Sequence, residues 1–257
     1  FEKAYCKKYS YQHGVSNNSG SSANLLMLSV LTSKLTENCL NKGDEVILPA
    51  LTWSTTVWPV IQMGLIPVYV DCNLDTFNID TNKIENAISK KTKAIFSVPI
   101  YGNPCEMDDI LAICKQHDLS LIEDCCESMG AMYKNKYAGT MVDIGGISLN
   151  CHKHIQTGEG GVLFTNDIKL AERMCMIRNH AESIVGDTDI KKISNLIGYN
   201  FRLGEIESAI GIEQLKKLDN IVLGRQKIAK KLYEGLNDLK GLVLPHVSKE
   251  NTHVYYM

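Results

Sequence analysis

A lysine stands between an apolar run and a glycine-rich turn in the segment from Ser148 to Gly161. The apolar run Ile144 to Leu149 predicts a strand, and Lys153 follows it closely. Lysine is the side chain that forms a Schiff base with a carbonyl compound, and flanking cationic groups help to keep its amine partly neutral and nucleophilic. His152 and His154 flank this lysine. Because a lone lysine is usually solvated surface, the chemical interpretation depends on the sites around it.

A carboxylate closes a second predicted strand. Asp124 follows the apolar run Leu119 to Ile122, with Glu123 between them. Open α/β sheets bind ligands just outside the carboxyl ends of their strands, so Asp124 lies where a ligand-facing charge belongs. The alternative is an N-cap for the next helix, which by itself is the more common role.

Small residues precede a predicted helix near the N-terminus. The segment Asn18 to Asn24 contains three serines and a glycine, and the helical run Leu25 to Leu31 follows directly. Free backbone amides and the positive end of the helix dipole together make an anion site, which here would suit a phosphate. The alternative is a simple N-cap in which Ser19 or Ser21 closes the first turn.

The elements that must position these residues alternate between strands and helices. The predicted strands are 45–48, 66–70, 94–98, 119–122, 144–149 and 162–165, and predicted helices span 81–89 and 107–114. Such alternation predicts βαβ units with right-handed crossovers and a mainly parallel sheet. The expected fold class is therefore α/β.

Long helices replace this pattern from Gly204 onward. A second long helix is expected at 226–239, and the run 241–245 predicts the first strand of a small C-terminal domain. The expected domains are 1–220, a large ligand-binding domain, and 221–257, a linking helix with the start of the small domain. The chain begins inside a predicted helix and stops in the β-like run 252–257. We therefore expect it to be a segment of a longer protein.

Composition excludes several classes of partner. The 257 residues include 27 Lys plus Arg and 29 Asp plus Glu, a net charge of −2 that provides no basic field for nucleic acid. No apolar run approaches the roughly 18 residues that a membrane span needs. The nine cysteines contain no CxxC pair, which favours reduced thiols and a cytoplasmic location. His152 and His154 have no second ligand pair at metal-site spacing, so no metal is expected.

Taken together, these elements resemble the DegT/DnrJ/EryC1/StrS family of pyridoxal 5′-phosphate (PLP)-dependent nucleotide-sugar aminotransferases, which have the fold type I, or aspartate aminotransferase, architecture. The most specific match is the Lys-x-x-x-x-Gly-Glu-Gly-Gly run that begins at Lys153, with Ser148 before it. Further matches lie at 1–3, 19–23, 49–53, 123–124 and 198–202. The resemblance implies a three-layer α/β/α sandwich with a mainly parallel central sheet, plus the start of a small C-terminal α/β domain.

The resemblance also implies roles around the cofactor ring. Lys153 would hold PLP as a Schiff base and act as the catalytic residue. Asp124 would pair with the protonated pyridine nitrogen and so make the ring an electron sink. Trp53 occupies the position whose flat aromatic face stacks on that ring.

Other positions would bind the cofactor phosphate. The resemblance implies that Ser21 and Ser22 hold the phosphate at the helix start and that Ser148 adds a hydroxyl. Asn200 would reach the phosphate of the neighbouring subunit's cofactor, because active sites in this family are shared across a homodimer. These four residues, with Lys153, make up the phosphate and aldehyde contacts that we expect.

Two substrate contacts and one departure complete the site. By the same resemblance, His154 and Arg202 would bind substrate. The family commonly places Gln three residues after the ring aspartate, near the phenolic oxygen of the cofactor, whereas this chain has Glu127. An ionised carboxylate would repel that oxygen, so Glu127 is protonated, turned away, or tuning the Schiff base.

The implied reaction moves an amino group from an amino acid, glutamate in most of the family, to a nucleotide-linked keto-(deoxy)sugar in amino-sugar, polysaccharide or glycan biosynthesis. The cofactor alternates between PLP and its pyridoxamine form, PMP. A minority branch has His in place of the lysine and performs sugar dehydration. Lys153 favours transamination, while the flanking histidines keep a PLP/PMP-dependent sugar dehydratase open as an alternative. A non-catalytic binding or regulatory member is the third.

Overall fold

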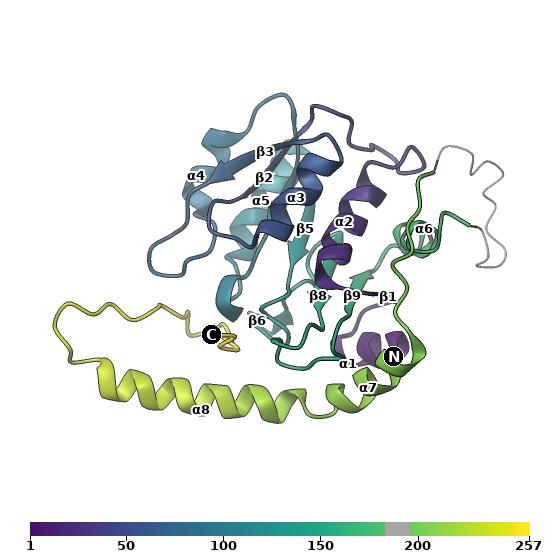
Figure 1. The fold of residues 1–257 in the computed structure, drawn as a ribbon. Helices are drawn as coiled ribbons and strands as arrows, with labels where there is room; N and C mark the ends of the chain where they lie inside the picture. Colours follow the sequence, from purple (N-terminus) through teal and green to yellow (C-terminus); the bar gives the residue numbers. More distant parts are fainter. Residues whose placement is uncertain (183–195) are drawn as a thin grey trace.

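The computed structural model describes residues 1–182 and 196–257, and its centre is a seven-stranded sheet (Figure 1). The strand order is β1-β9-β8-β5-β4-β2-β3. The strands are β1 (His13–Asn17), β2 (Glu45–Pro49), β3 (Ile66–Val70), β4 (Thr92–Ser97), β5 (Ser120–Asp124), β8 (Ile144–Ser148) and β9 (Gly161–Thr165). All pairs are parallel except those of β9, which is antiparallel to both β1 and β8. The predicted mainly parallel sheet is confirmed.

Helices cover both faces of the sheet and make it a three-layer sandwich (Figure 1). Helices α2 (Gly20–Leu31), α3 (Ser54–Gln62) and α6 (Ile168–Arg178) pack on one face, and α4 (Thr81–Ala87) and α5 (Met107–His117) pack on the other. Along β2, Val46 and Leu48 belong to the first core and Ile47 to the second. Because both faces are buried, the strands are almost continuously apolar, which is why their sequences revealed them.

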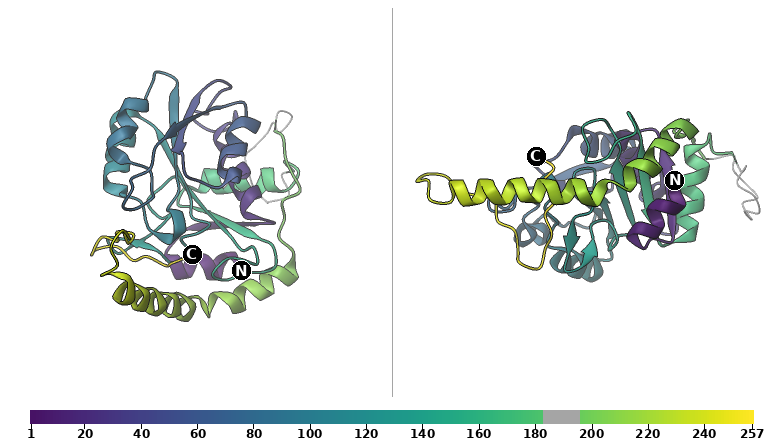
Figure 2. Two further views of the ribbon diagram at one scale, coloured as in Figure 1. Left: turned by 60° about the vertical axis from the view of Figure 1, so that its left-hand side comes forward. Right: turned by 90° about the horizontal axis from the view of Figure 1, so that it is seen from below.

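A third core lies under the β8 and β9 end of the sheet. It is formed by α1 (Glu2–Tyr9), α7 (Glu205–Leu215) and α8 (Leu218–Leu236), with Val254 from the C-terminal segment. Helix α8 runs along the outside of the molecule, and the chain then returns to the body, so that both termini lie on this side (Figure 2). The small hairpin β6 (Met132–Tyr133) and β7 (Lys136–Tyr137) and the short helix η1 (Ile100–Gly102) complete the described elements.

Two predictions for the C-terminal part differ from the structure. The helix expected at 226–239 begins earlier, at Leu218, and ends at Leu236. The strand expected at 241–245 is wrong: this stretch forms no strand, and Val243 is 80% exposed. A strand needs a partner for its backbone, and none of the described residues pairs with this stretch. The domain boundary near 220 stays a prediction.

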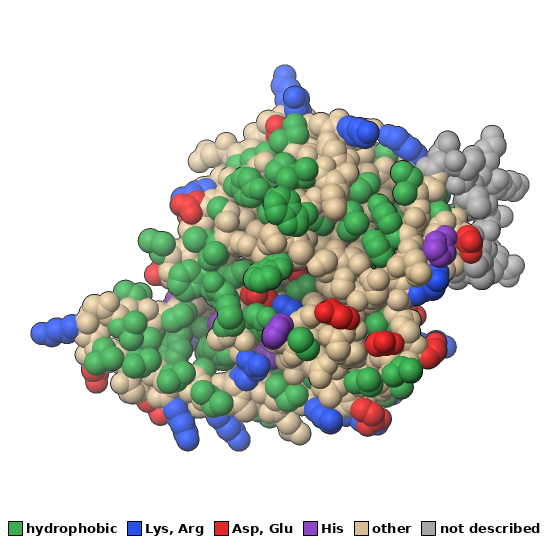
Figure 3. All heavy atoms as spheres, viewed as in Figure 1, with side chains coloured by type: hydrophobic (Ala, Val, Ile, Leu, Met, Phe, Trp, Pro, Cys, Tyr) green, Lys and Arg blue, Asp and Glu red, His purple; other side chains and the backbone are tan. Residues whose placement is uncertain are grey.

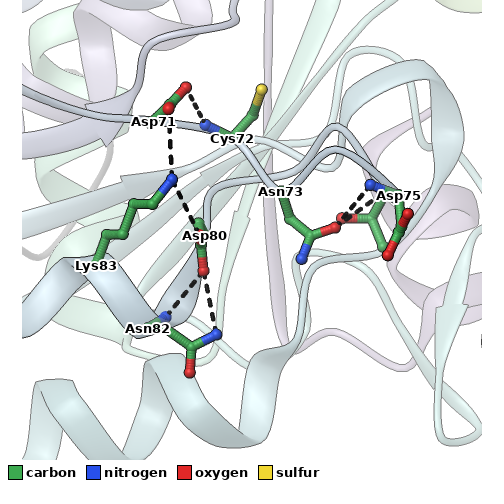
Figure 4. A network of polar contacts seen from close by, with 8 residues as sticks. Asp71, Cys72, Asn73, Asp75, Asp80, Asn82 and Lys83 are labelled. Atoms are coloured by element: carbon green, nitrogen blue, oxygen red, sulfur yellow. Dashed lines mark hydrogen bonds and ion pairs between the residues drawn. The ribbon is translucent and has the colours of Figure 1, made fainter.

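The loop after β3 is held by its own polar side chains (Figure 4). Lys83 Nζ lies 3.3 Å from an oxygen of Asp71 and 3.2 Å from one of Asp80. Asp80 caps α4 by accepting from the amide of Asn82. The loop also contacts the chain that follows α8, because the amide of His246 donates to the carbonyl of Asp75 at 2.7 Å.

Within residues 1–182 and 196–257, no helix combines the length and the hydropathy that crossing a membrane would require. In the same part of the chain, no cluster of three or more His, Cys, Asp and Glu side chains has the arrangement of a metal site. All nine cysteines are free thiols.

Candidate active site

The carboxyl ends of β1 and of the five parallel strands β2, β3, β4, β5 and β8 lie at one edge of the sheet, and most of the predicted site residues follow these strands. Helix α2 starts after β1, and Trp53 comes shortly after β2. Asp124 is the last residue of β5, Ser148 is the last of β8, and Lys153 lies in the turn that follows. Strand direction alone therefore brings together residues that lie far apart in the sequence.

The N-terminus of α2 packs directly against Ser148. A Cβ added to Gly20 would lie 2.6 Å from Ser148 Cβ and 3.1 Å from Cys126 Sγ, so only glycine allows this approach. Ser19 caps the helix by accepting from the amide of Ser22 at 3.0 Å. The amides of Gly20 and Ser21 donate no hydrogen bond within the described part of the chain. These amides and the adjacent hydroxyls form an anion cradle.

Asp124 is a buried carboxylate that is held by neutral donors. It is 4% exposed, and its Oδ2 accepts from Asn24 Nδ2 at 2.7 Å and from Thr56 Oγ1 at 2.8 Å. Its Oδ1 accepts from the amide of Cys126 at 3.1 Å. Among the residues that the structure describes, Asp124 forms no ion pair. A buried carboxylate that has hydrogen bonds but no cationic partner can bind one cationic N–H group of a ligand.

Glu127 is fixed at the same edge. Its Oε2 accepts from the amide of Tyr101 at 2.8 Å, and the side chain is half-buried. Burial raises the pKa of Glu127, while the bond to Tyr101 and the charge of Lys153 oppose that shift. The bond to Tyr101 and the raised pKa are compatible with all three alternatives for this residue, namely protonated, turned away from the phenolic oxygen, or tuning the Schiff base. The role of Glu127 stays a prediction.

The amine of Lys153 contacts a tyrosine from the C-terminal segment. Its Nζ donates to the hydroxyl of Tyr256 at 3.3 Å and lies 4.3 Å from the centroid of that ring. The charge of Lys153 also lowers the pKa values of Cys126 and Glu127, although burial raises both overall. The lysine is therefore close to the strand end that carries Asp124.

His154 faces the protein interior. It is 5% exposed, and its Nε2 donates to the carbonyl of Val254 at 3.0 Å. Burial lowers the pKa of His154 to about 4, so the ring is neutral at pH 7. The contacts that the structure gives this ring are all to protein, and its role toward substrate stays a prediction.

The remaining predicted residues are exposed. Trp53 is the N-cap of α3 and 69% exposed, and the same turn carries Thr56, which binds Asp124. Asn200 pairs with Asn179 in an isolated bridge, and Arg202 donates to the side chain of Asn179 at 2.5 Å. This segment lies beside the anion cradle, because the amide of Asn18 donates to the carbonyl of Phe201 at 2.8 Å. The roles of Trp53, Asn200 and Arg202 stay predictions.

Four residues of the site were not predicted from sequence. Asn24 and Thr56 hold Asp124, Tyr101 binds Glu127 through its amide, and Tyr256 contacts Lys153. Asn24 had a detectable signal, since it is a polar residue directly before the apolar run Leu25 to Leu28 of the same helix. The other three are ordinary loop or helix residues whose partners are distant in sequence, so no local pattern reveals them.

An apolar cavity of about 720 Å³ adjoins the site. Ile228 and Leu232 of α8 form one wall, and Phe77, Tyr101 and Tyr255 form the other. These three aromatic residues all have left-handed backbones, with φ of 63°, 56° and 49°. Apolar side chains gather along α8 and above it on this face (Figure 3).

The sheet order and the site place the chain in the class of PLP-dependent transferases of fold type I. One solved structure of this class, a GDP-4-keto-6-deoxymannose-3-dehydratase with a trapped PLP-glutamate geminal diamine, superposes with a TM-score of 0.91. The two sequences are 36% identical, and the match covers 99% of this chain and 68% of that one. The model of the DegT/DnrJ/EryC1/StrS aminotransferase family matches residues 1–257, and the chain belongs to that family.

Two characterised relatives carry different activities. The GDP-perosamine synthase of Caulobacter vibrioides is 35% identical over 258 residues, which cover 100% of this chain and 67% of that protein. The GDP-4-keto-6-deoxy-D-mannose 3-dehydratase of Escherichia coli O55:H7 is 38% identical over 251 residues, which cover 93% and 64%. The chain therefore spans about two thirds of the length of these relatives.

Proposed function

We propose that the protein is a PLP-dependent aminotransferase that moves an amino group from glutamate to a nucleotide-linked keto-(deoxy)sugar, in the biosynthesis of amino sugars for polysaccharides or glycans. The observation that carries this proposal is the meeting of Lys153, Asp124 and the N-terminus of α2 at one sheet edge. Family membership and a relative that is a GDP-perosamine synthase support it. The PLP-glutamate adduct in a neighbouring structure supports glutamate as the donor.

The residues present fit the cofactor. Asp124 is a buried carboxylate that has hydrogen bonds but no ion pair among the described residues, so it can accept a pyridinium N–H. The anion cradle has free amides that can donate to a phosphate. The groups that would hold PLP are Ser21, Ser22, Trp53, Asp124, Glu127, Ser148 and Lys153, with Asn200 from a second subunit. When bound, PLP supplies an electron sink that stabilises negative charge at the Cα of the donor.

Asp124 and Lys153 have separate roles in the proposed reaction. Asp124 cannot turn, because three hydrogen bonds hold it, so it keeps a proton on the ring nitrogen. Lys153 Nζ takes the proton from Cα of the donor, and the same group returns a proton when the amino group passes to the sugar. One lysine serves both half-reactions because each needs a base and an acid at the same place. Arg202 and His154 are the proposed substrate contacts.

A homodimer with shared active sites is part of this proposal. Helix α7 leaves Ile206 76% exposed and Ile210 41% exposed, beside the segment that carries Asn200 and Arg202. Apolar side chains that project from such a helix favour an interface. We also propose a cytoplasmic location, in keeping with the free thiols.

The deciding experiment follows the cofactor on the protein. We expect PLP and borohydride to leave a covalent adduct on the Lys153 peptide, detected by mass, and Lys153→Ala to remove it. Glutamate alone should convert the bound cofactor to PMP with release of 2-oxoglutarate. Lys227→Gln, which removes an exposed lysine of α8, serves as the control and should behave like the parent. Absence of any adduct in the parent protein would refute an enzyme of this class and favour a binding or regulatory member.

The second candidate is a PLP/PMP-dependent sugar 3-dehydratase. It is favoured by the 38% identity to a dehydratase and by the fold match to another. A panel of nucleotide-linked ketosugars with glutamate, read by mass, separates the two reactions. An amino sugar supports the transferase. Loss of water without incorporation of nitrogen identifies the dehydratase.

A further inference from the structure

We propose that Tyr256 is a positioning residue that holds the free amine of Lys153 in place for proton transfer. This inference rests on the proposed function, since it concerns the base that the transamination needs. Tyr256 lies 103 positions from Lys153 in the sequence, and its hydroxyl and its ring face both meet the same nitrogen.

The contact has two parts that act in the same direction. The Nζ group donates to the phenolic oxygen at 3.3 Å in either protonation state, and once it has taken a proton its position 4.3 Å from the ring centroid is within cation–π range. A free lysine side chain has many accessible rotamers. A ring face and a hydrogen-bond acceptor at one point restrict that freedom, so the amine stays beside the strand end.

The backbone of Tyr256 is anchored on both sides. Its amide donates to the carbonyl of Tyr101 at 2.8 Å, and its carbonyl accepts from Arg225 Nη1 at 2.8 Å. Just before it, the amide of Val254 donates to the carbonyl of Gly102 at 3.0 Å. A tyrosine held in this way acts as part of a rigid scaffold and does not need to be ordered when substrate binds.

A left-handed residue sets the direction of the ring. Tyr255 has φ of 49°, a left-handed conformation that is unfavourable for a residue other than glycine. Tyr255 stacks on His253 with ring centroids 4.0 Å apart and lines the apolar cavity, whereas Tyr256 turns toward Lys153. Across this turn, the side chain of Tyr255 lines the apolar cavity and that of Tyr256 lies against Lys153.

The first test does not depend on the cofactor. The protein without PLP is labelled with acetic anhydride, and the rate at which the Lys153 peptide is modified is read by mass. Loss of the ring in Tyr256→Leu should raise this rate about threefold. Tyr256→Phe keeps the ring and the volume and should give an intermediate rate. Tyr255→Phe is the matched control and should leave the rate unchanged.

The second test separates kcat from KM in the half-reaction with glutamate. We expect kcat to fall about tenfold in Tyr256→Leu and less in Tyr256→Phe, with KM within about twofold of the parent, because Tyr256 touches the base. A raised KM with unchanged kcat would instead make Tyr256 a substrate contact and overturn the proposal. Equal labelling rates in all variants would also overturn it. That result can be read even in a parent without turnover, where the proposed function alone would fail.

Discussion

Two regions meet at the candidate active site, and they are built differently. The sheet edge carries Asp124, Ser148 and the start of α2 on regular strands with parallel register. The C-terminal segment 252–257 forms no strand or helix, and a few hydrogen bonds fasten it to Met132, Gly102, Tyr101 and Arg225. Regular backbone places the residues expected to bind cofactor, whereas an irregular segment restrains the side chains of Lys153 and His154.

The difference has an energetic meaning. Strands of the sheet are held by many mutual hydrogen bonds and by burial on both faces, so losing one contact leaves the edge in place. The segment 252–257 depends on few contacts, each of which carries a larger share of its position. Substitutions at the sheet edge should therefore change chemistry in a stable protein, and substitutions around the segment should change both stability and chemistry.

The largest expected effect is on the sheet edge. Asp124→Ala should reduce the rate of the glutamate half-reaction by about 10³-fold, because the buried partner of the ring nitrogen is lost. The fold should remain, which circular dichroism checks. Thr56→Val removes one hydrogen bond to the same carboxylate and should cost only about tenfold. Near-normal turnover in Asp124→Ala would contradict the role proposed for it.

The next largest effect should be a loss of stability at Gly102, against which the C-terminal segment packs. Gly102 has φ of 96°, and an added Cβ would lie 2.7 Å from Val254 Cγ2 and 3.0 Å from the carbonyl oxygen of Glu127. Gly102→Ala should lower the free energy of unfolding by about 3 kcal/mol. Gly43→Ala is the matched control, since it has φ of 88° and open space, and should cost about 1 kcal/mol. Equal costs in urea unfolding would show that Val254 does not pack there.

Acid should weaken the same segment. Burial lowers the pKa of both His154 and His253 to about 4. Below about pH 6.5, the ordinary histidine pKa, these rings bind protons in the unfolded chain, whereas in the folded protein they stay neutral until about pH 4. The free energy of unfolding therefore falls as the pH drops from about 6.5 toward 4. By pH 5 the loss should be about 2 kcal/mol for each ring.

Denaturant unfolding at pH 7 and pH 5 measures this loss. The variant His154→Gln should lose less stability than the parent on acidification. The variant His152→Gln, which changes an exposed histidine two positions away, should lose as much as the parent. Identical pH dependence in all three proteins would show that the His154 ring does not carry the effect.

The smallest effect should come from the helix that fastens the segment. Arg225 Nη1 donates to the carbonyls of Tyr255 and Tyr256 at 3.0 and 2.8 Å. Arg225→Gln should cost about 1 kcal/mol of stability and raise the labelling rate of Lys153 slightly. Lys227→Gln, at an exposed position on the same helix, should change neither. A loss of stability equal to that of Gly102→Ala would show that one anchor dominates.

Much of the sheet was predictable because most of its strands are buried on both sides, although the edge strand β3 is only partly buried. The runs at 45–48, 66–70 and 119–122 are almost wholly apolar, and each became a strand within two residues of its expected bounds. The run 241–245 is equally apolar but formed no strand. Local composition indicates how much apolar surface a strand could bury. Whether the strand forms depends on a neighbouring strand that can pair with its backbone.

The sequence by itself determined the family, the parallel α/β fold and the order of Asp124, Ser148 and Lys153 at strand ends, because strand period and turn residues are local properties. Tertiary structure decided which side chains restrain them. Asn24 reaches Asp124 across 100 positions and Tyr256 reaches Lys153 across 103. Such contacts follow from the packing of whole elements, and a short stretch of sequence cannot specify them.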